Sequence, residues 1–234
     1  SLARHEGDIW RRKARLLGVN SLRYAGPPLE TGQHVFWAVR VQDSRGLWSD
    51  WSEGSEWTLG LIGKWDASWI RQAKPSRQSG TCDFGGNPAP LFKKQFRIKG
   101  GEKVTRALVF VSGLGHYQLW LDGKRLGQGG KGEAARMLGP AISSYNKRVY
   151  YDTFDVTSFF SRSEMDSKSK SKNGRTRAHV LHALVGNGWW NLEQMYFWGS
   201  KSFRDPLLLQ QEEQQRPQLL LELRVWYDGK VESG

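Results

Sequence analysis

The stretch Arg106–Gly127, "RALVFVSGLGHYQLWLDGKRLG", decides the fold. Asp122-Gly123 stands between "HYQLWL" and "KRLG", and Asp-Gly is a strong hairpin signal because both turn positions favour positive φ. Upstream, Gly113-Leu114-Gly115 separates an apolar run from this hairpin. The stretch therefore predicts a strand, a break and a second strand that enters a two-residue turn.

Apolar and polar residues alternate, with a period of two, through most of the chain. Alternation of apolar and polar side chains predicts half-buried antiparallel strands, and no stretch of a dozen residues keeps a helical period of 3.6. The fold class expected from this pattern is all-β. The apolar faces that alternate with polar ones are Val35, Trp37, Val39 and Val41; Phe92, Phe96 and Ile98; and Leu219, Leu221, Leu223, Val225 and Tyr227.

The strand pattern divides the chain into two blocks. Residues 1–60 supply three or four strands, which predicts a partial fibronectin- or immunoglobulin-like module. Residues 61–90 are expected to form a linker, rich in Gly, Ser and Pro from Lys74 to Pro90. Residues 91–234 supply at least six strands, which predicts an antiparallel β-sandwich of jelly-roll type. Both ends of the chain are expected to be cut from a longer protein.

Charge is unevenly distributed along the chain, which has a formal net charge of +12. Residues 161–177 hold six of the cations in a low-complexity stretch with little apolar surface, so we expect a disordered basic insertion there. This origin of the charge is favoured over a nucleic-acid surface. No run of about 18 apolar residues predicts a membrane span, so no membrane partner is expected.

The single cysteine and the N-terminal residues bear on disulfides, metal sites and localisation. The single Cys82 excludes an internal disulfide and a cysteine-cluster metal site. Ser1–His5 contains no apolar signal segment and no initiator Met, so we expect a targeting signal to be either absent or lost with an upstream part, and the localisation is unknown.

Trp48–Ser52 reads W-S-D-W-S, and two interpretations stay open. The pattern occurs near the end of the fibronectin-type modules of cytokine receptors, which would indicate a protein-binding module. Such modules normally contain disulfides, which the single Cys82 does not allow. The favoured alternative is a strand whose tryptophans stack on neighbouring Arg side chains.

Few residues carry a signature of catalysis. His179 and His182 would share a face on a helix, but on a strand they point to opposite sides, which argues against a shared metal. Asp122 is explained by its turn, and Asp155 by a local Asp-x-Thr cap. Glu193 has no such explanation, yet no second carboxylate accompanies it at the separation that a glycosidase needs. No catalytic residue is therefore assigned.

The segment "GNGWWN", Gly186–Asn191, is the candidate contact site. Successive residues of an extended segment face opposite sides, so one indole should be buried and the other exposed. We expect Trp189 in the core and Trp190 at the surface, where it would contact a sugar or another domain. The residues expected to form this contact site are Asn187, Trp190, Asn191 and Glu193.

Several sequence blocks resemble the N-terminal modules of bacterial-type α-L-rhamnosidases and follow one another in the same order as in that family. "FWAVRVQDSRGLWSDWSEGSEWTLGLIGKWDASWI" resembles the end of their fibronectin-like module. "LFKKQFRI", "RALVFVSGLGHYQLWLDGKRLG", "SYNKRVYYDTFDVTSFF", "LVGNGWWN" and "LLLELRVWYDG" resemble their N-terminal β-sandwich. The chain departs from the family at Asp122, where Asn is usual, at Trp190, where Tyr is usual, and at Leu138–Ile142, where Pro-Gly-Trp-Thr is usual.

This resemblance implies accessory β modules of a glycoside hydrolase. The family's catalytic part is an (α/α)6 barrel C-terminal to these modules, and we expect it to be absent from this chain, which would then be inactive alone. Full-length relatives remove terminal α-L-rhamnose with inversion, using two carboxylates and a water. The partners implied are the missing C-terminal catalytic domain and a rhamnose-containing glycan. Calcium accompanies rhamnose on the sandwich of some relatives, but none of those ligands maps onto a residue here.

Overall fold

The computed structural model describes residues 7–14, 21–73, 89–99, 103–129, 138–160, 178–190, 216–228 and 230–233. The chain forms two compact units, Ser1–Lys64 and Trp65–Gly234. Strands and one short 3-10 turn make up the regular structure of the described residues, which confirms the all-β fold class. The described part of the chain contains no helix that could cross a membrane.

The first unit is built on one hairpin-like pair. Strand β1 (His34–Trp37) pairs antiparallel with β2 (Ser55–Thr58). Of the residues of these two strands, Val35 is the one that is buried. Beyond this pair, an isolated bridge joins Gln42 to Trp48. Trp57 pairs with Val35 and therefore lies diagonally across from Trp37, and the two ring centroids are 6.1 Å apart.

The W-S-D-W-S segment forms a ladder along residues 39–42. The hydroxyls of Ser49 and Ser52 accept hydrogen bonds of 3.0 Å from backbone N–H groups of this neighbouring stretch. The Arg40 guanidinium lies 4.6 Å from the ring centroid of Trp48 and 4.8 Å from that of Trp51. The prediction that these tryptophans stack on an arginine is confirmed.

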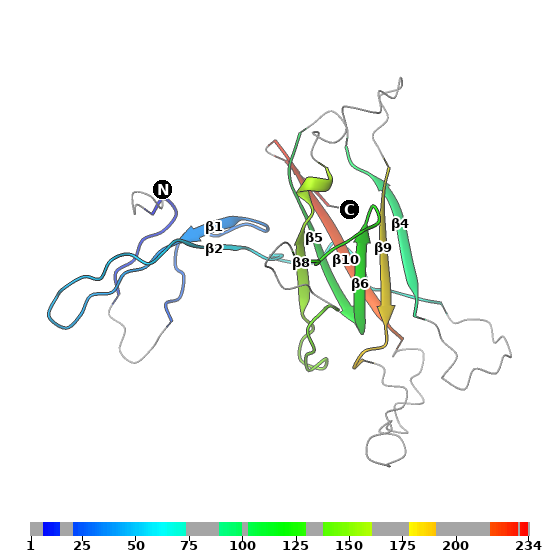
Figure 1. Cartoon of the computed structure of the whole chain (residues 1–234), viewed down its shortest axis with the longest axis horizontal. Coiled ribbons are helices and arrows are strands. Elements are labelled where there is room, and N and C mark those ends of the chain that lie inside the picture. The colour runs from blue at the N-terminus through cyan, green and yellow to red at the C-terminus, as the bar shows by residue number, and fades with distance from the viewer. Residues whose placement is uncertain are drawn as a thin grey trace, which may run out of the picture. The chain divides into compact units, whose positions relative to one another are not determined.

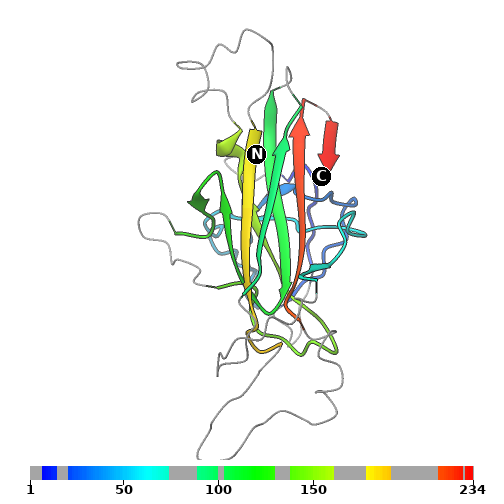
Figure 2. The same ribbon diagram turned by 90° about the vertical axis from the view of Figure 1, so that its right-hand side faces the viewer.

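The second unit is a β-sandwich of two antiparallel sheets (Figure 1). One sheet has the order β11-β10-β5-β8, with β3 also paired to β10, and the other has the order β4-β9-β6-β7. In Figure 2 the second of these sheets is turned toward the viewer, with β9 in yellow. The strands are β3 (Ile70–Arg71), β4 (Leu91–Arg97), β5 (Val104–Leu114), β6 (His116–Leu121), β7 (Lys124–Arg125), β8 (Tyr151–Asp155), β9 (Ala178–Gly186), β10 (Gln218–Tyr227) and β11 (Lys230–Ser233).

The core lies between the two sheets and follows the predicted alternation. Every second residue of β6 and β9 is buried there, and on β10 the same holds except at the partly buried Leu221, because antiparallel strands of a sandwich turn one face inward. The other face of the β10–β5 sheet is also partly buried, at Leu108 and Phe110 of β5 and at Leu220 and Glu222 of β10. The core residues from the three alternating strands are Tyr117, Leu119 and Leu121; Leu181, Ala183 and Val185; and Leu219, Leu223, Val225 and Tyr227.

Part of the outer face of the β10–β5 sheet is covered by residues 65–71. The Glu222 carboxylate is 1% exposed and accepts hydrogen bonds from the backbone N–H groups of Asp66 (2.8 Å) and Ala67 (3.3 Å). Arg224 donates to the same carboxylate at 2.6 Å, and β3 extends the sheet at Leu219. The sequence placed a linker at 61–90, whereas residues 65–71 pack on the sandwich. Residues 74–88 of that stretch lie outside the described residues.

Two predicted turns are present in the structure. Asp122 and Gly123 have φ of 49° and 78°, and they join β6 to β7 as the Asp-Gly signal predicts. The Asp155 carboxylate accepts hydrogen bonds from the backbone N–H (2.9 Å) and hydroxyl (2.6 Å) of Thr157, at the start of the 3-10 turn η2 (Thr157–Phe159). The predicted basic insertion at 161–177 lies outside the described residues.

Candidate functional site

The candidate site lies at the corner of the sandwich where β5 passes to β6 and β9 ends. Gly115 joins the two sheets with a φ of +111°, and a Cβ there would lie 2.2 Å from the carbonyl oxygen of Gly186. Gly188 has a φ of +51° and packs against the His116 ring, 2.8 Å from an added Cβ. These positions require glycine because backbone and ring come too close for a side chain.

The two indoles at this corner have the opposite environments from those expected. Trp189 is 49% exposed, whereas Trp190 is half-buried and packs edge-on against Tyr145 with ring centroids 5.3 Å apart. The assignment of Trp189 to the core was therefore wrong. The reason is the turn at Gly188, whose positive φ ends the extended backbone and with it the alternation of side chains.

Two buried polar atoms of this corner have no hydrogen-bond partner among the described residues. They are Nδ1 of His116 and Nε1 of Trp190. Burial raises the pKa of the neighbouring Tyr145 phenol, so this side chain stays neutral at physiological pH. The half-buried side chains of Trp190 and Tyr145 are thus aromatic and neutral, and Trp189 is the exposed aromatic side chain beside them.

The other predicted contact residues are only partly placed. Asn187 is half-buried in the turn between Gly186 and Gly188. Asn191 and Glu193 lie outside the described residues. The expected grouping of Asn187, Trp190, Asn191 and Glu193 therefore stays a prediction.

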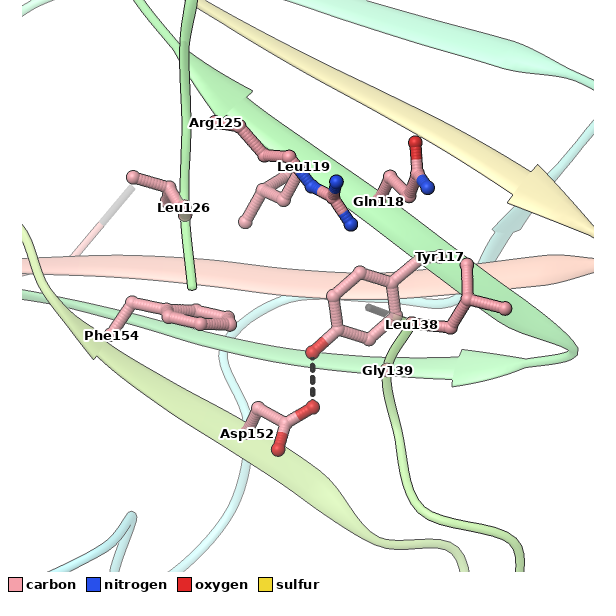
Figure 3. A pocket seen from close by; sticks show the side chains of 9 residues that line it. All are labelled: Tyr117, Gln118, Leu119, Arg125, Leu126, Leu138, Gly139, Asp152 and Phe154. Atoms are coloured by element: carbon pink, nitrogen blue, oxygen red, sulfur yellow. Dashed lines mark hydrogen bonds between the residues drawn. The ribbon is translucent and has the colours of Figure 1, made fainter. Parts of the chain in front are cut away.

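A small depression lies beside this corner, at the open side between β6 and β8 (Figure 3). The Tyr117 hydroxyl donates a hydrogen bond of 2.5 Å to the Asp152 carboxylate. Gly139 exchanges backbone hydrogen bonds with Tyr117. It also lies close to the Asp152 side chain, since an added Cβ at Gly139 would be 2.6 Å from a carboxylate oxygen of Asp152. The depression is lined by Tyr117, Gln118, Leu119, Arg125, Leu126, Leu138, Gly139, Asp152 and Phe154.

The depression holds little. Its volume is about 10 Å³, enough for one water molecule. Asp152 is the carboxylate among the lining residues, and it already accepts the Tyr117 hydroxyl. Hydrolysis of a glycoside requires a pair of carboxylates about 5–10 Å apart, which these lining residues do not supply.

Of the two histidines of β9, His179 has a structural role. His179 is 1% exposed, packs between Phe96 and Phe160, and places Nδ1 2.8 Å from the Asp122 carboxylate. His182 lies on the other face of β9, as predicted. The other oxygen of the Asp122 carboxylate accepts the backbone N–H of Val180 at 2.9 Å, so this aspartate does more than form its turn.

The described residues do not fit a calcium site. Among them, no group of three His, Cys, Asp or Glu side chains could hold a metal ion. Both carboxylate oxygens of Asp122 are engaged by β9, and Asp152 is engaged by Tyr117. Calcium prefers six to eight oxygen ligands, which these residues do not assemble.

Comparison with protein families matches both units. Residues 102–233 match the family described as the α-L-rhamnosidase N-terminal domain. Residues 4–63 match the family described as the Rha78A-like N-terminal immunoglobulin domain. The first unit is thereby immunoglobulin-like, and the alternative of an unrelated protein-binding fibronectin module is not favoured.

Individual relatives agree with this result. An α-L-rhamnosidase from Formosa agariphila is 26% identical over 78% of this chain and 19% of its own length. One from Alteromonas sp. is 26% identical over 79% of this chain and 18% of its own. The solved α-L-rhamnosidase from Dictyoglumus thermophilum superimposes with a TM-score of 0.64 and 27% identity, over 100% of this chain and 23% of that one. The chain thus spans about a fifth of the length of these relatives.

Proposed function

The chain belongs to the α-L-rhamnosidase N-terminal domain family, and from this premise we propose that it is a non-catalytic accessory part of an α-L-rhamnosidase, a glycoside hydrolase. The observation that carries the proposal is that each of the two compact units matches an N-terminal domain of this class of enzyme. The first unit matches the immunoglobulin domain, and the second matches the α-L-rhamnosidase N-terminal domain. The role proposed is support of the enzyme's catalytic domain by contact.

The surface proposed for this contact is the corner around Trp189. Its indole is 49% exposed although large aromatic side chains stabilise most when buried. The neighbouring Trp190 packs edge-on against Tyr145, and Trp is among the residues enriched at protein interfaces. We therefore assign to Trp189 the contact role that was predicted for Trp190.

Binding of rhamnose to the sandwich is the competing role, and the described residues support it less. The depression at Tyr117 and Asp152 has room for about one water, far less than a sugar ring needs. Leu138–Ile142 lacks the Trp of the family's Pro-Gly-Trp-Thr segment, so an aromatic platform is missing at that position.

Titration with L-rhamnose separates the two roles. We expect no saturable heat in isothermal calorimetry up to about 10 mM sugar, because support by contact requires no sugar site. Trp189→Ala and the control Trp57→Ala, which removes an indole of similar exposure from the first unit, should behave like the parent. Saturable binding that is lost in Trp189→Ala and kept in Trp57→Ala would replace the supporting role by a sugar-binding one.

A further inference from the structure

The outer face of the β4-β9-β6-β7 sheet carries a row of cationic and aromatic side chains. The strand register pairs Lys93 with His182, His182 with Trp120, and Trp120 with Arg125. Residues directly opposite one another in antiparallel strands project from the same face. With strands about 4.8 Å apart, the row crosses all four strands over about 14 Å.

This row lies on the face that points away from the core. The residues that alternate with it, such as Leu119, Leu181 and Ala183, are buried between the sheets. Lys93 is exposed, and His182, Trp120 and Arg125 are half-buried. The same face continues with Leu91, Gln95 and Arg97 on β4, Val180 and Leu184 on β9, and Gln118 on β6.

The acidic residues of the sandwich strands are confined to one of the two sheets. None of the residues of β4, β6, β7 and β9 is Asp or Glu, while the Lys and Arg residues of these strands are Lys93, Lys94, Arg97, Lys124 and Arg125. The acidic residues of the sandwich strands belong to the other sheet, which also carries Lys and Arg residues. The acidic ones are Asp152, Asp155, Glu222 and Glu232, and the basic ones are Arg71, Arg106, Arg224 and Lys230. A face with one sign of charge concentrates ligands of the opposite sign.

We propose that this face, which we call the cationic sheet face, binds a polysaccharide that carries carboxylates. Lys93 and Arg97, four residues apart on one exposed strand and about 13 Å from one another, suit carboxylates repeated along an extended polymer. Trp120 at the centre of the row supplies an apolar ring face for a sugar, and Gln95 and Gln118 supply amide donors and acceptors for hydroxyls. The proposal does not involve Trp189, although Gln118 and Arg125 of this face also line the small depression at Tyr117.

The test is binding of polygalacturonate, with its fully methyl-esterified form as the uncharged polymer of the same backbone. We expect the full chain to retard in affinity gels that contain the acid and not in gels that contain the ester, with retardation falling as salt rises from about 50 to 300 mM. Lys93→Glu/Arg97→Glu should weaken binding at least about tenfold. Trp120→Leu, which keeps an apolar side chain, should weaken it by a smaller factor of about three.

The matched control is Lys147→Glu/Arg148→Glu, two exposed residues of the 138–150 loop with the same change of charge. This pair should change the affinity less than about twofold. If both double variants lost the same amount of affinity, binding would depend on the net charge of +12 rather than on this face, and the proposal would be overturned. Equal binding of the methyl ester, or tighter binding of single-stranded DNA than of the acid, would also overturn it.

Discussion

Gly115→Ala is expected to lower the stability of the sandwich by about 4 kcal/mol, through strain and a backbone clash. An added Cβ would lie 2.2 Å from the carbonyl oxygen of Gly186, the last residue of β9, and 3.2 Å from that of Asn187 in the turn that follows. The φ of +111° adds strain for any residue with a side chain. Thermal denaturation followed by circular dichroism should show the midpoint of the second unit falling by about 8–16 °C.

Gly123→Ala is the control that separates the clash from the strain. Gly123 has a φ of +78°, but a Cβ there would meet nothing within 4 Å. Its replacement should therefore cost only the backbone strain, about 1–2 kcal/mol. Midpoints lowered equally in both variants would mean that β6 and β9 do not approach closely at Gly115, and the corner would have to be described differently.

Glu222→Ala is expected to lower stability by about 3 kcal/mol and to release residues 65–71 from the sheet. The substitution leaves the backbone N–H groups of Asp66 and Ala67 without their acceptor. It also removes the carboxylate that holds Arg224, whose remaining contact is Asp66 at 3.6 Å. Urea denaturation gives the loss, and hydrogen exchange should show reduced protection at Asp66 and Ala67.

Glu56→Ala serves as the comparison, since it removes a carboxylate that is 60% exposed and pairs with His34 at 3.2 Å. Exposed ion pairs contribute little, so its effect should stay below about 0.5 kcal/mol. If Glu222→Ala were as mild as Glu56→Ala, or if exchange at Asp66 and Ala67 were unchanged, residues 65–71 would not depend on this carboxylate.

Local patterns predicted the strands and turns of the sandwich well. The alternation through Leu219–Tyr227 matches the inward face of β10, and Asp122-Gly123 forms the expected turn. Both features depend on neighbouring residues, so they are visible in the sequence. Residues 65–71 were assigned to a linker because their partner Glu222 lies 155 and 156 positions away from Ala67 and Asp66, a distance that no local pattern reports.

The candidate site was less predictable. A positive φ at Gly188 reverses the environments of Trp189 and Trp190, and "GNGWW" alone does not show which glycine turns the chain. The contact of Tyr117 with Asp152 joins residues 35 positions apart. The one available signal was that Tyr117 falls on the inward face of β6, where a buried hydroxyl needs a partner.

The central claim is that these two β modules support a rhamnosidase without catalysing its reaction. Its most direct test is incubation of the purified chain with an aryl α-L-rhamnoside, with release of the phenol followed over hours. We expect no turnover above the buffer blank, because the described residues offer no pair of carboxylates around a pocket that admits a sugar. Turnover that disappears in Glu193→Gln would contradict the claim and make the chain itself the hydrolase.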